Sequence, residues 1–242
     1  MSEIQISELE RVAILTLKRP GYGNRITQGM AEELIAALDS ARRNPDILGC
    51  VLTGHGDVFC LGGDYQGAGP RISGRMEFGR AHIDLFDAMA RLGKPLVAAL
   101  NGNAHAGGFA VMIACDLAFA EEGATFGLPE IAHGLFPLLA LAVVRDALPK
   151  KVLFDIVYNA RLLSGEEARA LHLVNEVVPH GTSVRRAVAA VEAASHGNPD
   201  ILAIGRDLYY AMRGLSPAEA LDKARFALGS ALGARDERPT KG

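Results

Sequence analysis

The stretch from residue 94 to residue 119 reads KPLVAALNGNAHAGGFAVMIACDLAF, in which two apolar runs flank a glycine-rich turn. The first run, residues 95–100, is short and shows no polar alternation, so it predicts a strand buried on both faces. The second run, residues 109–114, is apolar at every position, which is typical of a helix buried all round. A chain with this segment has to fold around a buried strand, turn and helix.

Gly107 and Gly108 lie where the buried helix is expected to begin. The first backbone N–H groups of a helix have no partner inside the helix, and glycine lets a ligand approach them closely. The position therefore suits an anionic or polarised oxygen. The alternative interpretation is that the two glycines only permit close packing of the helix against the strand.

Chain length and composition indicate one large α/β core. The chain has 242 residues, 49% of them hydrophobic, and a net charge of -3. Its basic residues are scattered, which argues against a nucleic-acid partner. The first residues lack the charged and apolar segments of a signal peptide, and no apolar run approaches the roughly 18 residues of a membrane span. We expect a cytoplasmic protein without nucleic-acid or membrane partners.

The three cysteines, Cys50, Cys60 and Cys115, show no CxxC spacing and no neighbouring cluster of histidines. An odd number of unclustered cysteines predicts neither a disulfide framework nor a structural zinc site. Each is expected to be a small buried apolar residue. We predict no metal ion and no redox cofactor.

Strand and helix patterns alternate along the first part of the chain. The expected strands cover residues 4–17, 47–53, 95–100 and 173–178, with a short strand inside residues 58–64, and the expected helices include residues 138–147, 150–159 and 165–171. From residue 183 onward only helices are expected. This order argues for an α/β core over residues 1–182 and a helical C-terminal region over residues 183–242, within one structural unit.

Two glycine pairs, Gly62-Gly63 and Gly107-Gly108, each follow a buried strand and can present a backbone N–H at the same edge of a sheet. Two such donors about 3 Å from one oxygen form an oxyanion hole. Glu130 lies between a proline and an apolar residue in a segment short of charge, where desolvation would raise its pKa and suit it to proton transfer. The alternative for Glu130 is a first-turn residue favoured by the helix dipole.

Six motifs resemble, in order and spacing, those of the enoyl-CoA hydratase/isomerase (crotonase) superfamily. They are Arg19-Pro20 with Asn24, FCLGGD at 59–64, KPLVAALNG at 94–102, AGG at 106–108, CDL at 115–117 and TFGLPE at 125–130. The resemblance runs from about residue 12 to residue 231. It implies an α/β fold built as a crotonase-like spiral of ββα turns. It also implies that the helical C-terminal region serves in trimerisation, often within a dimer of trimers.

The resemblance also implies a ligand and the roles of several residues. Members of this superfamily bind an acyl-CoA thioester, so coenzyme A enters as part of the substrate. The backbone N–H groups that match Gly63 and Gly107 hold the thioester oxygen and stabilise an enolate. The adenine and pantetheine lie along the loop formed here by Cys60, Leu61, Gly62 and Asp64.

Ala110 marks a departure from the hydratase pattern. Typical hydratases carry two catalytic glutamates, the first of which would fall at Ala110, while the second matches Glu130. A single glutamate serves Δ3,Δ2-enoyl-CoA isomerases and some hydratases of branched acyl-CoAs. We therefore expect isomerisation or single-glutamate hydration. The alternatives are a crotonase-fold decarboxylase or C–C hydrolase, or a catalytically silent subunit that binds acyl-CoA.

Three histidines are candidates to replace the missing carboxylate. His105, two residues before Gly107, could act as an acid or base near neutral pH, or could point away and bond to a carbonyl. His82 lies on the helix that lines the acyl pocket in relatives, although a place on the helix surface is the simpler expectation. His133, three residues after Glu130, would face much the same way as that glutamate.

Two apolar or aromatic positions are expected to shape the acyl pocket. Phe136 belongs to LFPLL, residues 135–139, where many relatives have a glycine-rich turn. Tyr65 is expected either to cover the acyl group or to be exposed. The chain stops at Gly242, short of the last helix usual in the superfamily, which predicts a more open site or weaker binding of coenzyme A.

Overall fold

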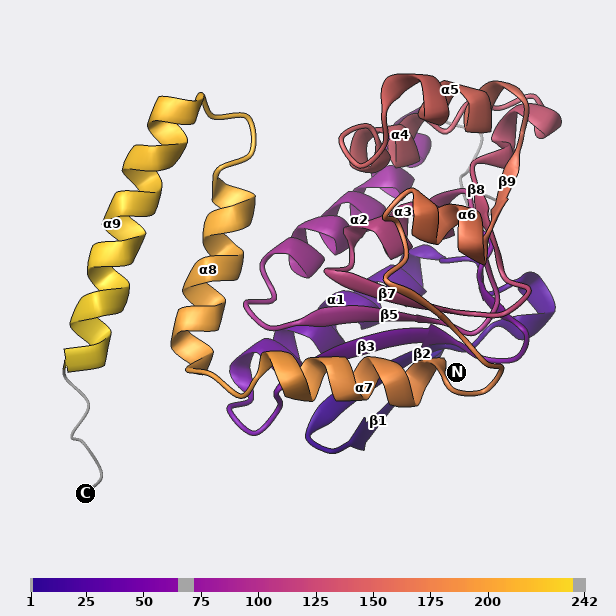
Figure 1. Ribbon diagram of the computed structural model, residues 1–242. Coiled ribbons are helices and arrows are strands. Elements are labelled where there is room, and N and C mark those ends of the chain that lie inside the picture. Colours follow the sequence, from indigo (N-terminus) through magenta and orange to yellow (C-terminus); the bar gives the residue numbers. More distant parts are fainter. Residues whose placement is uncertain (1, 65–71, 237–242) are drawn as a thin grey trace.

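The computed structural model describes residues 2–64 and 72–236, so Tyr65 lies outside the described residues. Its elements repeat in the order strand, strand, helix (Figure 1). The three successive repeats are β1 (Ile4–Leu9), β2 (Val12–Leu17) and α1 (Gln28–Arg43); β3 (Gly49–Gly54), β4 (Val58–Cys60) and α2 (Ile72–Ala90); and β5 (Leu96–Leu100), β6 (Asn103–His105) and α3 (Gly107–Ala114). A fourth strand pair, β7 (Leu117–Glu121) and β8 (Thr125–Gly127), leads into the short 3-10 helix η2 (Pro129–His133). Another 3-10 turn, η1 (Pro20–Tyr22), precedes α1.

From β3 onward, the two strands of each repeat enter different sheets. The larger sheet has the order β1-β2-β3-β5-β7-β10, where β10 is Glu176–Val178, and all its neighbours are parallel except β1 and β2. The smaller sheet has the order β4-β6-β8-β9, where β9 is Leu162–Ser164, and only β8 and β9 run antiparallel. The chain thus winds as a ββα spiral in which each turn from β3 onward adds one strand to each sheet.

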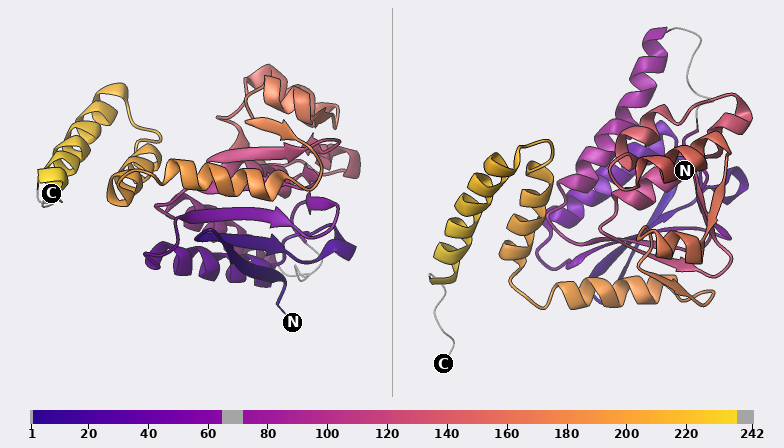
Figure 2. Two further views of the ribbon diagram at one scale, coloured as in Figure 1. Left: turned by 60° about the horizontal axis from the view of Figure 1, so that its bottom comes forward. Right: turned by 45° about the horizontal axis from the view of Figure 1, so that its top comes forward.

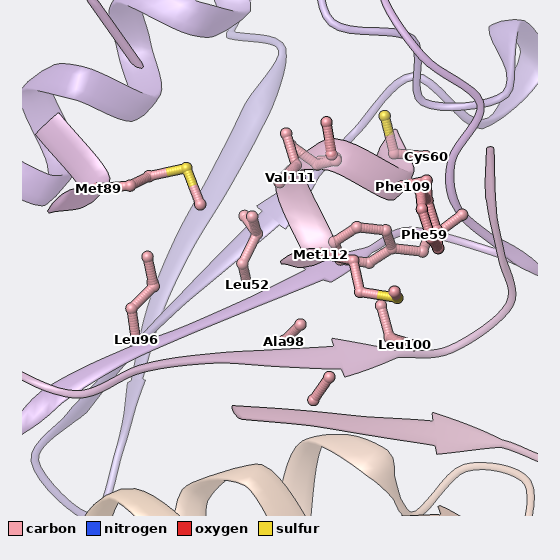
Figure 3. Close-up of a cluster of buried hydrophobic side chains, with 14 of the residues drawn as sticks. Leu52, Phe59, Cys60, Met89, Leu96, Ala98, Leu100, Phe109, Val111 and Met112 are labelled. Atoms are coloured by element: carbon pink, nitrogen blue, oxygen red, sulfur yellow. The ribbon is translucent and has the colours of Figure 1, made fainter. Parts of the chain in front are cut away.

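The strand at the centre of the sequence pattern is also central in the larger sheet. β5 pairs with β3 and β7, and its five residues are all buried, which confirms the expected strand. Figure 3 shows Phe109 and Met112 of α3 directed toward Ala98 and Leu100 of β5. The fully apolar surface of α3 therefore forms the middle of the main core.

The helix that follows residue 182 completes the packing of the larger sheet. α7 (Ser183–Ala194) buries its apolar side against the sheet face opposite the main core (Figure 2). The buried residues of this second cluster are Val12, Ile14, Val51, Val97, Ala99 and Phe119 of the sheet and Ala187, Val188 and Val191 of α7. Both faces of β5 are thereby removed from water, as its unbroken apolar sequence requires.

The remaining helices differ in how closely they pack. α4 (Leu138–Val144) packs against α3, α5 (Lys150–Tyr158) packs against η2, and α6 (Gly165–Ala170) packs against β8 and β9 of the smaller sheet. α4 ends three residues earlier than the sequence predicts. α8 (Pro199–Ala211) and α9 (Pro217–Asp236) form a hairpin that stands away from both sheets (Figures 1 and 2). Arg206 fastens α8 to the core, because its guanidinium pairs with Asp116 at 2.9 Å and donates to the carbonyls of Met89 and Ala90. None of the helices in the described part of the chain is both long and apolar enough to cross a membrane.

Polar residues of the motifs hold the backbone of neighbouring segments. Lys94 Nζ donates to the carbonyls of Ala41, Asn44 and Ile47 at 2.7, 2.6 and 2.8 Å, so it closes the end of α1 just before β5 begins. Asn101 Oδ1 accepts from Gly54 N at 2.9 Å. These side chains explain why such motifs recur around strands: they tie each spiral turn to the next.

Candidate active site

The three segments with candidate catalytic groups follow neighbouring strands of the smaller sheet. Gly63 comes after β4, Gly107 after β6, and Glu130 after β8. β4, β6 and β8 are adjacent and parallel, so their carboxyl ends meet at one edge of the sheet. The fold therefore brings three segments that are far apart in sequence to one place.

The backbone of Gly63 is held by a bridge to Ile26. Ile26 N donates to Gly62 O at 2.9 Å, and Asp64 N donates to Ile26 O at 2.8 Å, which makes Ile26 and Gly63 partners in a parallel bridge. In this bridge Gly62 and Asp64, on either side of Gly63, make both hydrogen bonds to Ile26. The N–H of Gly63 itself therefore points to the opposite side of its strand. The Gly63 N–H is thus directed away from Ile26.

Gly107 brings a second backbone amide to the same place. It is the first residue of α3, after Ala106, whose φ of 54° and ψ of -126° turn the chain sharply. A Cβ on Gly107 would lie 3.3 Å from Gly63 N, and a Cβ on Gly62 would lie 3.3 Å from Gly107 N. The two main chains are in van der Waals contact, with the two amides side by side.

The next glycine has a different role. A Cβ on Gly108 would lie 2.1 Å from the carbonyl oxygen of Cys60, so only glycine fits there. Of the two interpretations of this glycine pair, close packing applies to Gly108, whereas Gly107 borders an open cavity. The first-turn amides of α3 have no intrahelical partners, which leaves them available to an acceptor.

A cavity of about 620 Å³ lies in front of these amides. Its described walls come from the glycine loops, α2, α3, η2 and the start of α4, and they are mostly apolar. The lining residues are Ile26, Gly62, Gly63, Gly79, His82, Ile83, Leu85, Phe86, Gly107, Ala110, Val111, Glu130 and residues 135–140. Gly63, Gly107 and Glu130 therefore share one cavity, and Phe136 lies in its wall.

Glu130 is the carboxylate of this cavity. Its Oε2 atom is buried and has no hydrogen-bond partner within the described residues. Burial raises the pKa of Glu130, against the opposing effect of its own backbone N–H. A desolvated carboxylate without a fixed partner is poised to accept and return a proton.

Ala110 occupies the wall one turn of α3 beyond Gly107. It is fully buried and lines the cavity next to Val111. A methyl group therefore stands where a second carboxylate would face the same space. Among the described lining residues, Glu130 is the single carboxylate and His82 the single imidazole.

The three histidines are placed very differently. The expectation of a helix-surface position for His82 is wrong, because its side chain is only 7% exposed and lines the cavity. His105 is turned to Thr125, with Nε2 2.9 Å from the hydroxyl oxygen, and does not line the cavity. Its bonding partner is a hydroxyl in place of the carbonyl considered from the sequence, and burial lowers its pKa. His133 is exposed and does not line the cavity, although it is three residues from Glu130.

The loop after β4 is fixed by its own contacts. Cys60 is fully buried, and burial raises the pKa of its thiol to about 12, so it stays neutral at physiological pH. Leu61 N donates to Gly23 O at 2.9 Å. The Asp64 carboxylate pairs with Arg19 at 2.9 Å. Gly62 has a φ of 113°, a conformation that favours glycine.

The Glu121 carboxylate, outside this cavity, plays a structural part that the sequence did not indicate. Glu121 is buried at the end of β7 and accepts from Ser183 Oγ at 2.7 Å. Burial opposes its ionisation, yet hydrogen bonds from Gly181 and Ser183 lower its pKa overall. Its carboxylate thus secures the start of α7. Within the described residues, no three His, Cys, Asp or Glu side chains are grouped closely enough to hold a metal ion.

Two neighbouring glycine amides and a carboxylate with one buried oxygen line the same mostly apolar cavity, and this combination defines the class of site. Such a site polarises a carbonyl oxygen and moves a proton at a neighbouring carbon. Sequence reasoning missed Ile26, and it named His82 as a candidate but expected it on the helix surface. Their roles depend on contacts between distant segments, for which the local pattern carries no signal.

Comparison with known proteins identifies the family. The sequence profile of the family described as "Enoyl-CoA hydratase/isomerase" matches residues 7–226. The chain belongs to this family, and its α/β spiral with a helical C-terminal region is the crotonase-like fold that the motifs predicted.

Individual relatives cover most of the chain. It is 33% identical over 192 residues to "Enoyl-CoA hydratase EchA19" of Mycobacterium tuberculosis, covering 77% of this chain and 72% of that protein. It is 32% identical over 225 residues to a "Putative enoyl-CoA hydratase" of Thermus thermophilus, covering 91% and 88%. The crystal structure of an enoyl-CoA hydratase of Mycobacterium smegmatis superposes with a TM-score of 0.90 at 26% identity, covering 96% of this chain and 91% of that one.

Proposed function

We propose that this protein binds an enoyl-CoA thioester and moves its double bond between the β,γ and α,β positions. The observation that supports this proposal is the pairing of Glu130 with Ala110. One buried carboxylate faces the cavity, and a methyl group occupies the place of a second one. A single base is sufficient for a proton shift, whereas hydratases with two glutamates use both of them on one water.

The proposed reaction needs no oxidant and no added atom. The Glu130 carboxylate takes a proton from Cα, and the electron pair of that C–H bond passes through the carbonyl to the thioester oxygen. The Gly63 and Gly107 N–H groups stabilise the resulting dienolate, each by about 10² to 10³ in rate. The Glu130 carboxylic acid then returns the proton to Cγ, and the carbonyl re-forms. General acid/base transfer of this kind contributes about 10² to 10⁴.

The acyl chain would lie along the apolar wall. Leu85 and Phe86 of α2, Val111 of α3 and Phe136 line the cavity that begins at the two amides. Burial of an alkyl chain there is favourable by about 0.8 kcal/mol for each CH₂ group. The thioester end of coenzyme A would approach along the loop of Cys60, Leu61, Gly62 and Asp64.

Hydration is the second candidate, and the names of the relatives favour it. The proteins of Mycobacterium tuberculosis and Thermus thermophilus are both named as hydratases. In that case the same two amides would polarise the thioester, and Glu130 alone would activate the water that adds at Cβ. Decarboxylation, C–C hydrolysis and binding without turnover remain distinct outcomes of the experiment below.

The experiment follows a β,γ-unsaturated hexenoyl-CoA, an α,β-unsaturated hexenoyl-CoA and a carboxylated acyl-CoA by mass spectrometry and by the absorbance of the conjugated thioester. An isomerase changes the absorbance at constant mass, a hydratase adds the mass of one water, and a decarboxylase acting on a carboxylated acyl-CoA loses carbon dioxide. The Glu130→Gln variant should lose at least about 10²-fold in turnover. The exposed His133→Gln is the control and should retain it. A loss of less than about tenfold in Glu130→Gln would remove this glutamate from the reaction.

We also propose self-association, as a homotrimer or a dimer of trimers. α8 has no fully buried residue, and α9 exposes Leu221 at 72% and Phe226 at 70%. α8 is joined to the core through Arg206, while α9 projects beyond it and packs against α8 (Figure 1). Apolar side chains exposed at this density are typical of surfaces that a partner subunit covers.

A further inference from the structure

The geometry points to His82 as a positioning residue for the oxyanion hole, a role that deepens the proposed function and rests on it. His82 does not touch the proposed reacting atoms. It acts through Ile26, the residue whose backbone holds Gly63.

The first step of the argument is the contact of the imidazole. His82 lies on α2, is 7% exposed, and places Nε2 3.1 Å from the carbonyl oxygen of Ile26. A carbonyl oxygen can only accept a hydrogen bond, so Nε2 carries the hydrogen. This contact joins α2 to a segment 56 residues earlier in the chain.

The second step is that the same carbonyl holds the glycine loop. Ile26 O also accepts from Asp64 N at 2.8 Å, while Ile26 N donates to Gly62 O at 2.9 Å. One carbonyl oxygen therefore receives both the His82 imidazole and the amide that follows Gly63. Movement of Ile26 would shift the Gly63 N–H, which belongs to the cavity wall and points away from Ile26.

The third step concerns the loop itself. Gly62 has a φ of 113° and precedes another glycine, so the local sequence does little to restrict this backbone. A preorganised hole requires donors that stay in place while charge develops on the oxygen. The loop is therefore held from outside, by Gly23 at Leu61, by Arg19 at Asp64, and at Gly63 itself by the bridge to Ile26 with its His82 contact.

The fourth step connects the hole to the acyl cavity. Ile83, Leu85 and Phe86 flank His82 on α2 and line the same cavity. One helix thus carries both the wall for the acyl chain and the imidazole that supports the hole. Loss of the imidazole removes the support of the hole but leaves the apolar side chains of α2 in the cavity wall. The change should therefore lower kcat more than it alters KM.

The test compares His82→Leu, which removes the N–H, with His82→Gln, whose side-chain amide can donate from about the position of Nε2. His82→Leu should lower kcat on the hexenoyl-CoA substrate by about tenfold to 10²-fold and change KM by less than about threefold. His82→Gln should recover most of the kcat. His133→Leu, the same change at an exposed position, is the matched control and should behave as wild type.

A second readout does not require turnover. Hexanoyl-CoA labelled with ¹³C at the thioester carbonyl is saturated and unreactive, and its infrared stretching band moves to lower wavenumber when two amides polarise the oxygen. The band should shift in wild type, Glu130→Gln and His82→Gln, and should shift less in His82→Leu. Circular dichroism verifies folding, and if His82→Leu fails to fold, His82→Asn, whose shorter amide does not reach Ile26, replaces it.

The outcomes separate this inference from the proposed function. If His82→Leu polarises the thioester as wild type does and keeps its kcat, His82 has no positioning role, while the proposed reaction stands. Equal loss of kcat in His82→Gln and His82→Leu also overturns the inference. A wild-type protein that leaves the carbonyl band unshifted overturns the oxyanion hole itself, and the proposed function with it.

Discussion

The contrast between Gly107 and Gly108 gives the sharpest prediction for the oxyanion hole, because adjacent glycines should fail in different ways. A methyl group on Gly107 would lie 3.3 Å from Gly63 N, a tight contact that shifts of a few tenths of an ångström relieve. A methyl group on Gly108 would lie 2.1 Å from the carbonyl oxygen of Cys60, which is main chain and has no rotamer to change. Gly107→Ala should therefore fold, and Gly108→Ala should be destabilised.

The expected magnitudes follow from these contacts. Alanine is favoured over glycine in helices by up to about 1 kcal/mol, so the free energy of unfolding of Gly107→Ala should stay within about 1 kcal/mol of wild type. Its methyl group would occupy space at the Gly63 amide that the thioester oxygen needs. Loss of one such donor costs about 10² to 10³ in kcat. Gly108→Ala should lose about 1–3 kcal/mol of stability or more, as overpacked cores do.

Urea unfolding followed by far-UV circular dichroism measures the stabilities, and hexenoyl-CoA turnover measures the activity. The reasoning predicts a stable, inactive Gly107→Ala and an unstable Gly108→Ala. If Gly107→Ala folds and keeps its turnover within about threefold of wild type, the two amides do not form the hole. If Gly108→Ala is as stable as wild type, the close approach of α3 to β4 is wrong.

Two further predictions concern Glu130 and the C-terminal hairpin. Because burial raises the pKa of Glu130 above the ordinary value of about 4.3, kcat/KM should fall on the acidic side with an apparent pKa above that value. The same shift makes the ionised side chain costly in the folded state, so stability is lost as pH rises through the raised pKa. Glu130→Gln should be more stable than wild type at neutral pH, with the difference closing below about pH 4.3 in urea titrations. Phe226→Glu on α9 should dissociate the proposed oligomer in sedimentation velocity without unfolding the core, and an unchanged sedimentation coefficient would contradict the hairpin interface.

Much of the fold followed from local sequence patterns. The apolar run at residues 95–100 predicted a strand buried on both faces, and β5 is such a strand, covered by the main core and by α7. The helix expected at residues 165–171 is α6, and Ser164 and Glu167 form a capping box at its start. These features depend on periodicity and on residues three or four apart, which sequence displays directly.

The site was less accessible to sequence reasoning. Its motifs drew attention to Gly63, Gly107 and Glu130, but they gave no sign that Gly108 packs against the carbonyl oxygen of Cys60. The surface position expected for His82 was wrong, because the sequence of α2 gave no sign that the imidazole would reach Ile26. A hydrogen bond between residues 56 positions apart depends on how the helix docks, which no local pattern encodes.

The sequence by itself determined the buried strand at residues 95–100, the helices after residue 183, the two glycine pairs and a glutamate in an uncharged segment. The tertiary structure alone decided that these groups share one cavity, since the parallel pairing of β4, β6 and β8 brings their following segments to one edge. It also decided which candidate groups line that cavity, because Glu130 borders it with a pKa raised by burial while the exposed His133 does not. Chemistry at the site depends on distances and desolvation in three dimensions, and the chain acquires both only when its spiral closes.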